Sequence, residues 1–169
     1  SSVAHMGFVT LGIFSANIQG LHGAIIQMIS HGIISAALFF SIGSIYNRYK
    51  TKRIDFFGGL IIKFPYFSVV FLIFSLGSIG LAGSSGFVVE YLTLLAVYSK
   101  NTMVAFISTL GVILSASYML KLYKRVFLGG LSENLDKKQD DINIYEISLY
   151  VVLVILIFII GIKPGLILS

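Results

Sequence analysis

The chain has 169 residues, of which 57% are hydrophobic and only 11% are charged. Soluble domains are typically about 45–50% apolar, so this composition and the mean hydropathy of +0.96 exclude an ordinary soluble protein and indicate a polytopic membrane protein. The net charge of +5 does not indicate nucleic-acid binding, because the basic residues lie mainly at the ends of apolar stretches, near anionic lipid headgroups. Since the sequence has no cysteine, disulfides, thiolate metal sites and iron–sulfur clusters held by this chain are also excluded.

The charge-free stretches predict six membrane helices, the first of them incomplete. A spanning helix needs about 20 apolar residues, and residues 3–15 supply about two-thirds of that length. The chain starts at Ser1, without a methionine or a targeting peptide, so we expect a fragment, a processed product or a chain with further residues before Ser1. The other expected spans are residues 23–46, 64–80, 87–98, 103–123 and 147–162.

Charge counting does not decide the orientation of six alternating spans. One side would carry seven basic residues and the other five, too close for the positive-inside rule. The first set is Arg48, Lys50, Lys52, Arg53, Lys63, Lys100 and Lys163, and the second is Lys121, Lys124, Arg125, Lys137 and Lys138.

The stretch from Gly80 to Tyr91, GLAGSSGFVVEY, places a glycine-rich break and one carboxylate, Glu90, inside an apolar run. A charged side chain at the centre of a membrane helix costs roughly 2.5–3.5 kcal/mol, so intramembrane acids generally line a pathway or pair with a partner. Backbone groups freed by a break at Gly80, Gly83 and Gly86 need partners from protein or water, and broken helices of this kind mark transport sites. We interpret Glu90 as a transport residue, with a structural ion pair as the alternative.

His31 lies near the middle of an expected span, with Gln27 four residues before it and Ser35 four after it, so the three form a polar stripe on one helix face. Imidazole titrates near neutral pH and can pass a proton between its nitrogens, which favours a proton relay. Interhelical hydrogen bonds, worth about 0.6 kcal/mol each, are the alternative. His5 fits packing and relay equally, and His22 is expected in a turn. No catalytic residue, metal-ligand cluster or phosphate loop is predicted.

Five motifs follow one another in an order that resembles the antiporter-like subunit 4 family of respiratory complex I: SSVAHMGFVTLGIF, GAIIQMISHGIISAALFFSIGSIYNR, KTKRIDFFGGL, GLAGSSGFVVEYL and SASYMLKLYKRVFLG. The resemblance covers nearly the whole chain. It implies an all-α polytopic transmembrane bundle, with one antiporter-like five-helix repeat at residues 1–125 that contains a discontinuous helix. A polar loop at residues 126–146 and a final transmembrane helix at residues 147–169 would follow.

By motif, the resemblance implies that Glu90 is the acid of the family's broken twelfth helix. In the same way, His31 and His5 match the histidines of the tenth and ninth helices. An acid at this position is typical of subunit 4, whereas sister subunits and cation/proton antiporters usually carry lysine there.

The chain departs from the family pattern near the break. Ala82 stands where proline is usual, and Val89 stands where glycine is usual before the acid. The sequence therefore leaves two positions open for the break, the glycine-rich segment or residues 99–102.

The resemblance implies the C-terminal part of a proton-translocating subunit in the membrane arm of NADH:ubiquinone oxidoreductase, in the mitochondrial inner membrane. The expected proton pathway consists of Glu90, His31, His5, Gln27 and Ser35. No cofactor is expected in this chain; FMN, iron–sulfur clusters and ubiquinone would bind other subunits, and structural lipids would surround it. Expected partners are the polypeptide or segment with the N-terminal helices, the antiporter-like subunits 2 and 5, and lipids. The alternatives are a piece of a cation/proton antiporter and a non-pumping scaffold.

Overall fold

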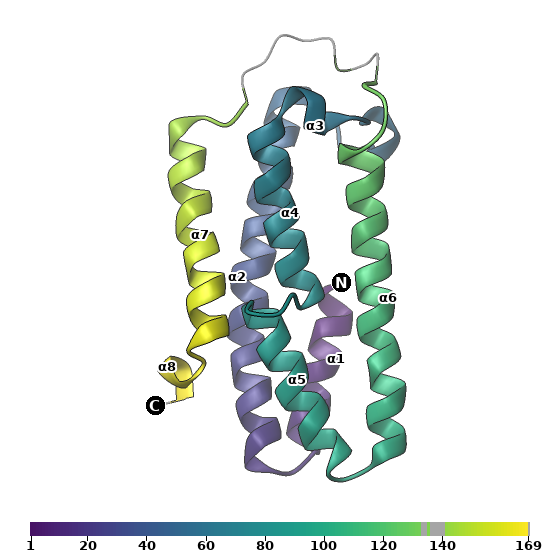
Figure 1. The fold of residues 1–169 in the computed structure, drawn as a ribbon, viewed down its shortest axis with the longest axis vertical. Helices are drawn as coiled ribbons and strands as arrows, with labels where there is room; N and C mark the ends of the chain where they lie inside the picture. Colours follow the sequence, from purple (N-terminus) through teal and green to yellow (C-terminus); the bar gives the residue numbers. More distant parts are fainter. Residues whose placement is uncertain (133–134, 136–140, 169) are drawn as a thin grey trace.

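The structure is a computed structural model, and it describes residues 1–132, 135 and 141–168 (Figure 1). Regular structure in these residues is entirely helical: α1 (Ser2–Phe14), α2 (Ile18–Tyr49), η1 (Ile54–Phe56), α3 (Leu60–Lys63), α4 (Pro65–Ile79), α5 (Ser85–Tyr98), α6 (Thr102–Phe127), α7 (Ile144–Ile162) and α8 (Gly165–Leu168). Among them α2, α6 and α7 are long and apolar enough to cross a membrane. The predicted all-α transmembrane bundle is confirmed. Most of the charged positions in the expected polar loop lie outside the described residues.

Helices α4 and α5 form one interrupted crossing of the bundle, since α5 continues downward from the end of α4 in Figure 1. They contain 15 and 14 residues, or about 22 and 21 Å at 1.5 Å per residue, so neither alone covers a hydrocarbon core of about 30 Å. Gly80 ends α4 at φ 88° and Gly83 lies in the link at φ 90°, values that side chains rarely adopt. These glycines interrupt the helix without reversing the chain. The expectation of two separate spans was therefore wrong.

The glycine-rich segment is thus the break that the sequence left open. Within it, the amide of Leu81 donates to the carbonyl of Leu76, and the amide of Ser84 donates to that of Leu81. Residues 99–101 instead form the turn at which the chain reverses between α5 and α6 (Figure 1). Asn101 caps α6 there by accepting hydrogen bonds from the amides of Met103 and Val104.

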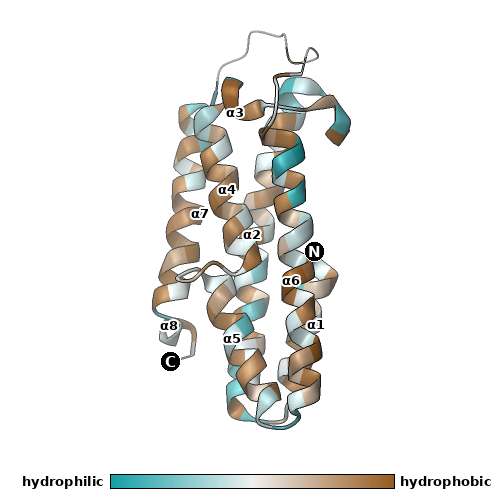
Figure 2. Ribbon diagram, turned by 45° about the vertical axis from the view of Figure 1, so that its right-hand side comes forward, coloured by the Kyte–Doolittle hydropathy of each residue, from teal (hydrophilic) through white to brown (hydrophobic). Residues whose placement is uncertain are grey.

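An aromatic core fills the upper half of the bundle. Phe67 and Phe71 of α4 pack against Phe127 of α6, and the Phe71 and Phe127 ring centroids are 4.8 Å apart. Tyr150 of α7 closes this core from the other side, 5.8 Å from the Phe74 ring. Below the break the hydrophobic contacts are sparser, and Figure 2 shows that apolar residues continue along the outer helices, as a lipid-facing surface requires.

Because α4 and α5 together cross the bundle once, the basic residues are divided between its two ends differently from what six separate crossings would give. The link between α2 and α4 and the end of α6 both lie at the upper end of Figure 1. The basic residues of these segments are Arg48, Lys50, Lys52, Arg53, Lys63, Lys121, Lys124 and Arg125. The lower turns carry Lys100, and Lys163 follows α7. Lys137 and Lys138 lie outside the described residues. The near-equal division expected from six crossings is therefore wrong.

Candidate functional site

Glu90 lies in the second turn of α5 and is 6% exposed. Its carboxylate lies directly against the break: a Cβ added to Gly80 would be 2.8 Å from Glu90 Oε2. Gly86, expected in the break, is instead in the first turn of α5, because the chain has already returned to helix at Ser85. There it packs so closely on the carbonyl of Gly77 that a side chain would overlap this oxygen. The glycines thus bring the end of α4 onto the acid-bearing helix.

His5 of α1 is the ionisable partner of Glu90. Its Nδ1 lies 3.8 Å from Glu90 Oε1, and both residues are buried. The other ring nitrogen, Nε2, lies 3.5 Å from the hydroxyl of Ser78, which is in the last turn of α4. The imidazole therefore lies between an acid on one side of the break and a hydroxyl on the other.

His31 of α2 continues this row of polar groups. Its ring centroid is 5.5 Å from that of His5, and the planes are tilted by 50°. The ring is partly exposed, and its Nε2 lies 3.1 Å from the hydroxyl of Ser2 and 3.2 Å from that of Ser35. His31 on the stripe expected on α2 therefore faces α1, and the polar groups run from Glu90 past the two imidazoles to the hydroxyls of Ser2 in α1 and Ser35 in α2.

A cavity of about 10 Å³ lies between these groups. Its lining residues are His5, Gln27, Ser30, His31, Ile34, Gly77, Ser78 and Gly86. Gln27 is 2% exposed, and its Oε1 has no hydrogen-bond partner in the described part of the chain. A volume of about 10–15 Å³ accommodates one water molecule when polar partners are available. The cavity is thus sized and lined for a single water between the two histidines.

The arrangement suits proton transfer and offers little to a metal. The described residues contain no group of three or more His, Asp or Glu side chains placed to hold a metal ion. A carboxylate and two imidazoles are instead groups that accept and release protons, and hydroxyls and a carboxamide can hydrogen-bond to such groups or to a water between them.

The model of the family described as NADH:quinone oxidoreductase/Mrp antiporter, transmembrane, matches residues 1–124. The chain belongs to this family. Among its relatives, NADH-quinone oxidoreductase subunit M of Rhodobacter capsulatus is 48% identical over 99% of this chain and 33% of that protein. NADH-ubiquinone oxidoreductase chain 4 of Marchantia polymorpha is 43% identical over 97% of this chain and 33% of that protein. The chain spans about one third of the length of the curated relatives it matches.

Two solved structures have the same fold as this chain. A chain of respiratory complex I from Thermus thermophilus with bound NADH matches with a TM-score of 0.87 and 30% identity, over 96% of this chain and 34% of that chain. A chain of the Mrp complex from Dietzia sp. DQ12-45-1b matches with a TM-score of 0.83 and 22% identity, over 97% and 39% of the two chains. This second likeness shows the fold alone. The resemblance inferred from the five motifs is confirmed.

Sequence reasoning missed three serine hydroxyls of this candidate site, those of Ser30, Ser78 and Ser85. Ser30 donates to Ser85 at 2.6 Å between α2 and α5, and Ser78 lies beside His5. Ser30 carried a usable signal, because it lies three residues after Gln27 on the same helix face. Ser78 and Ser85 carried a weaker signal, which was their position on either side of Gly80 and Gly83. His22, expected in a turn, lies within the second turn of α2, because Asn17 starts this helix by accepting from the amide of Gly20.

Proposed function

We propose that this chain is the C-terminal part of the proton-translocating, antiporter-like subunit 4 of respiratory complex I. Electron transfer in other subunits would be coupled to protonation changes at Glu90, His5 and His31. The observation that carries the proposal is the 3.8 Å approach of His5 to Glu90 at the break of a membrane-crossing helix. The names of the relatives that are 43–48% identical support the assignment to complex I.

The first step of the proposed path is a proton transfer between Glu90 and His5. The proton leaves Oε1 of the carboxylic acid and bonds to Nδ1 of the imidazole, so an O–H bond breaks, an N–H bond forms and an ion pair results. The two atoms, now 3.8 Å apart, must approach to about 2.6–3.2 Å for direct transfer. In this proposal, a movement of α5 that brings the two atoms within this distance opens the step.

The second step carries the proton from His5 to His31. Their ring centroids are 5.5 Å apart, and both rings line the small cavity beside the carboxamide of Gln27. A water that donates to Gln27 Oε1 would bridge the rings. The hydroxyls of Ser2 and Ser35 lie 3.1 and 3.2 Å from Nε2 of His31 and would take the path onward. In this proposal the five residues of the expected pathway act one after another along this route.

The proposal includes the surroundings of the chain. We place it in the mitochondrial inner membrane because its bias toward Phe, Ile and Tyr suits an AT-rich mitochondrial gene. Bacterial relatives of similar identity make a bacterial plasma membrane the alternative. The proposed partners are the polypeptide or segment that carries the remaining helices, the antiporter-like subunits 2 and 5, and lipids. FMN, iron–sulfur clusters and ubiquinone belong to other subunits in this proposal.

Co-migration with NADH dehydrogenase activity separates this proposal from a cation/proton antiporter. The native membrane is extracted with mild detergent, run on a native gel and stained for the activity, and the bands are analysed by mass spectrometry. The proposal predicts peptides of this chain in the active band, together with those of an N-terminal portion of the subunit. Peptides confined to bands without this activity would overturn the assignment to complex I and favour the antiporter.

A further inference from the structure

Helix α7 lies outside the residues that match the family model, yet it contacts both helices of the interrupted crossing, α4 and α5. Tyr150 packs near the Phe74 ring. Ile157 lies beside Gly77, because a Cβ added to this glycine would be 3.5 Å from Cγ2 of Ile157. Both side chains are 1% exposed. The aromatic core and the end of α4 thus rest on α7.

The lower end of α7 lies directly on the break. A Cβ added to Gly161 would be 2.5 Å from the carbonyl carbon of Ser84 and closer still to the carbonyl oxygen of Gly83. Both are backbone atoms, which cannot rotate away as a flexible side chain would. One residue earlier, Ile160 belongs to a buried cluster with Ile26 and Val89, and Val89 precedes Glu90. Only glycine at position 161 permits this approach of α7 to the link between α4 and α5.

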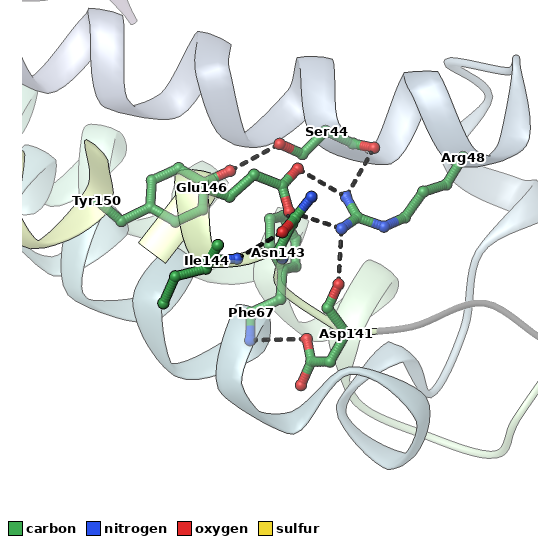
Figure 3. A network of polar contacts seen from close by, with 8 residues as sticks. All are labelled: Ser44, Arg48, Phe67, Asp141, Asn143, Ile144, Glu146 and Tyr150. Atoms are coloured by element: carbon green, nitrogen blue, oxygen red, sulfur yellow. Dashed lines mark hydrogen bonds and ion pairs between the residues drawn. The ribbon is translucent and has the colours of Figure 1, made fainter. Parts of the chain in front are cut away.

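The upper end of α7 is fixed by the network in Figure 3. The guanidinium of Arg48 donates to both carboxylate oxygens of Glu146, at 3.0 and 2.7 Å, and to the carbonyl of Asp141 at 2.6 Å. The carboxylate of Asp141 accepts from the amides of Tyr66 and Phe67 in the first turn of α4. One connected set of bonds therefore ties the start of α7 to the end of α2 and to the start of α4.

We propose that α7 is a brace that sets the position of the break, with Gly161 as its positioning residue. The brace is attached to α4 at the start of that helix through Asp141, and to the break through Gly161. Because α7 is held at both ends, it fixes the distance between the start of α4 and the break. It thereby fixes where α5 begins and how close Glu90 lies to His5. This inference rests on the proposed proton path, and it adds a role for a helix that contributes no polar group to that path.

Two matched pairs of variants test the brace in the assembled complex in its native membrane. Gly161→Ala adds a Cβ against the backbone of the break, whereas Gly165→Ala adds one with nothing within 4 Å. Ile160→Ala removes most of a buried side chain from the cluster that contains Val89, whereas Ile159→Ala removes the same atoms from a side chain that is 45% exposed. The readouts are the amount of assembled complex, the rate of NADH oxidation, the number of protons translocated per electron pair, and the Glu90–His5 distance in a structure of each variant.

The brace predicts a lower proton-to-electron ratio and a changed Glu90–His5 distance in Gly161→Ala and Ile160→Ala, with NADH oxidation retained and both controls unaffected. If Gly161→Ala fails to assemble, the Ile160 and Ile159 pair decides the question. An unchanged ratio and distance in Ile160→Ala would overturn the brace. Glu90→Gln, measured alongside, separates the two ideas: a loss of pumping there with no effect of the α7 variants rejects the brace alone, whereas no effect of Glu90→Gln rejects the proton path.

Discussion

Glu90 is nearly inaccessible to solvent, but it is not isolated, because the His5 imidazole lies within ion-pairing distance. A buried carboxylate without a partner is strongly unfavourable, and the histidine offers either a positive charge or a proton acceptor. The pair can therefore exist as a neutral acid beside a neutral imidazole, or as an ion pair. Such a two-state unit is what proton translocation requires, because a change of charge nearby can shift the proton from one group to the other.

The sequence identified these polar residues, but not their contacts. Glu90, His31 and Gln27 could be predicted because each interrupts an apolar stretch, where a polar group is costly without a function. The pairing of His5 with Glu90 could not be predicted from spacing. The two residues are separated by most of the repeat, and they meet only because α1 and α5 pack together.

At the residue scale, Gln27→Leu separates a structural role from a role in proton transfer. The side-chain oxygen of Gln27 bonds no group in the described part of the chain, so an apolar replacement of similar size breaks no hydrogen bond between this oxygen and the protein and should leave the thermal stability of the complex nearly unchanged. Proton pumping should fall, because the leucine removes the polar partner of a water between His5 and His31. Thermal unfolding and proton-to-electron ratio are measured together.

Met28→Leu provides the control, because Met28 is the next residue and is 50% exposed. A Gln27→Leu complex that is less stable but pumps normally would show that the carboxamide serves packing.

At the scale of elements, the break between α4 and α5 depends on the positive φ of Gly80 and Gly83 and on the close packing of neighbouring backbone around it. Sequence reasoning placed Gly80 and Gly83 in an interrupted region, where the structure has them, but it also placed Gly86 there and treated the two apolar stretches as separate crossings. The direction in which the chain leaves a left-handed glycine depends on what it packs against, and here α2, α6 and α7 all contact both α4 and α5. That information is absent from the local sequence.

Gly80 and Gly83 form a matched pair for testing the break. Both have positive φ, so alanine at either position should destabilise the protein by about 1–2 kcal/mol through backbone strain. Only at Gly80 would the added Cβ also meet the Glu90 carboxylate, at 2.8 Å; at Gly83 it meets nothing within 4 Å. We expect Gly80→Ala to lower both thermal stability and the proton-to-electron ratio, and Gly83→Ala to lower stability alone. Equal pumping in the two variants would contradict the placement of the carboxylate.

At the scale of the whole molecule, the basic residues gather at the upper end in Figure 1, where the α2–α4 link and the end of α6 meet. The positive-inside rule counts Lys and Arg in short loops near the ends of the spans, so this asymmetry favours the matrix or cytoplasmic side for the upper end. Counting charges in the sequence did not decide the orientation, because α4 and α5 were treated as separate crossings and the same basic residues were therefore assigned to both sides.

Single introduced cysteines test this orientation, because the sequence contains none of its own. Lys52→Cys reports on the upper end and Lys100→Cys on the lower turn, and both positions are exposed. In sealed vesicles with the matrix or cytoplasmic face outward, a membrane-impermeant maleimide should label Cys at position 52 and leave position 100 unlabelled until detergent is added. The reverse pattern would show that the bundle is inserted the other way.

The most direct test of the central claim is the proton-to-electron ratio of the Glu90→Gln complex. Glutamine keeps the size of the side chain and its hydrogen-bonding capacity, but it cannot release a proton. Asp55→Asn is the matched control, because Asp55 is an exposed acid paired with Arg125 at the surface. Proton uptake is measured during NADH oxidation in sealed vesicles with equal amounts of assembled complex. We predict fewer protons per electron pair for Glu90→Gln and the normal ratio for Asp55→Asn; a normal ratio in Glu90→Gln would contradict the proposed proton path.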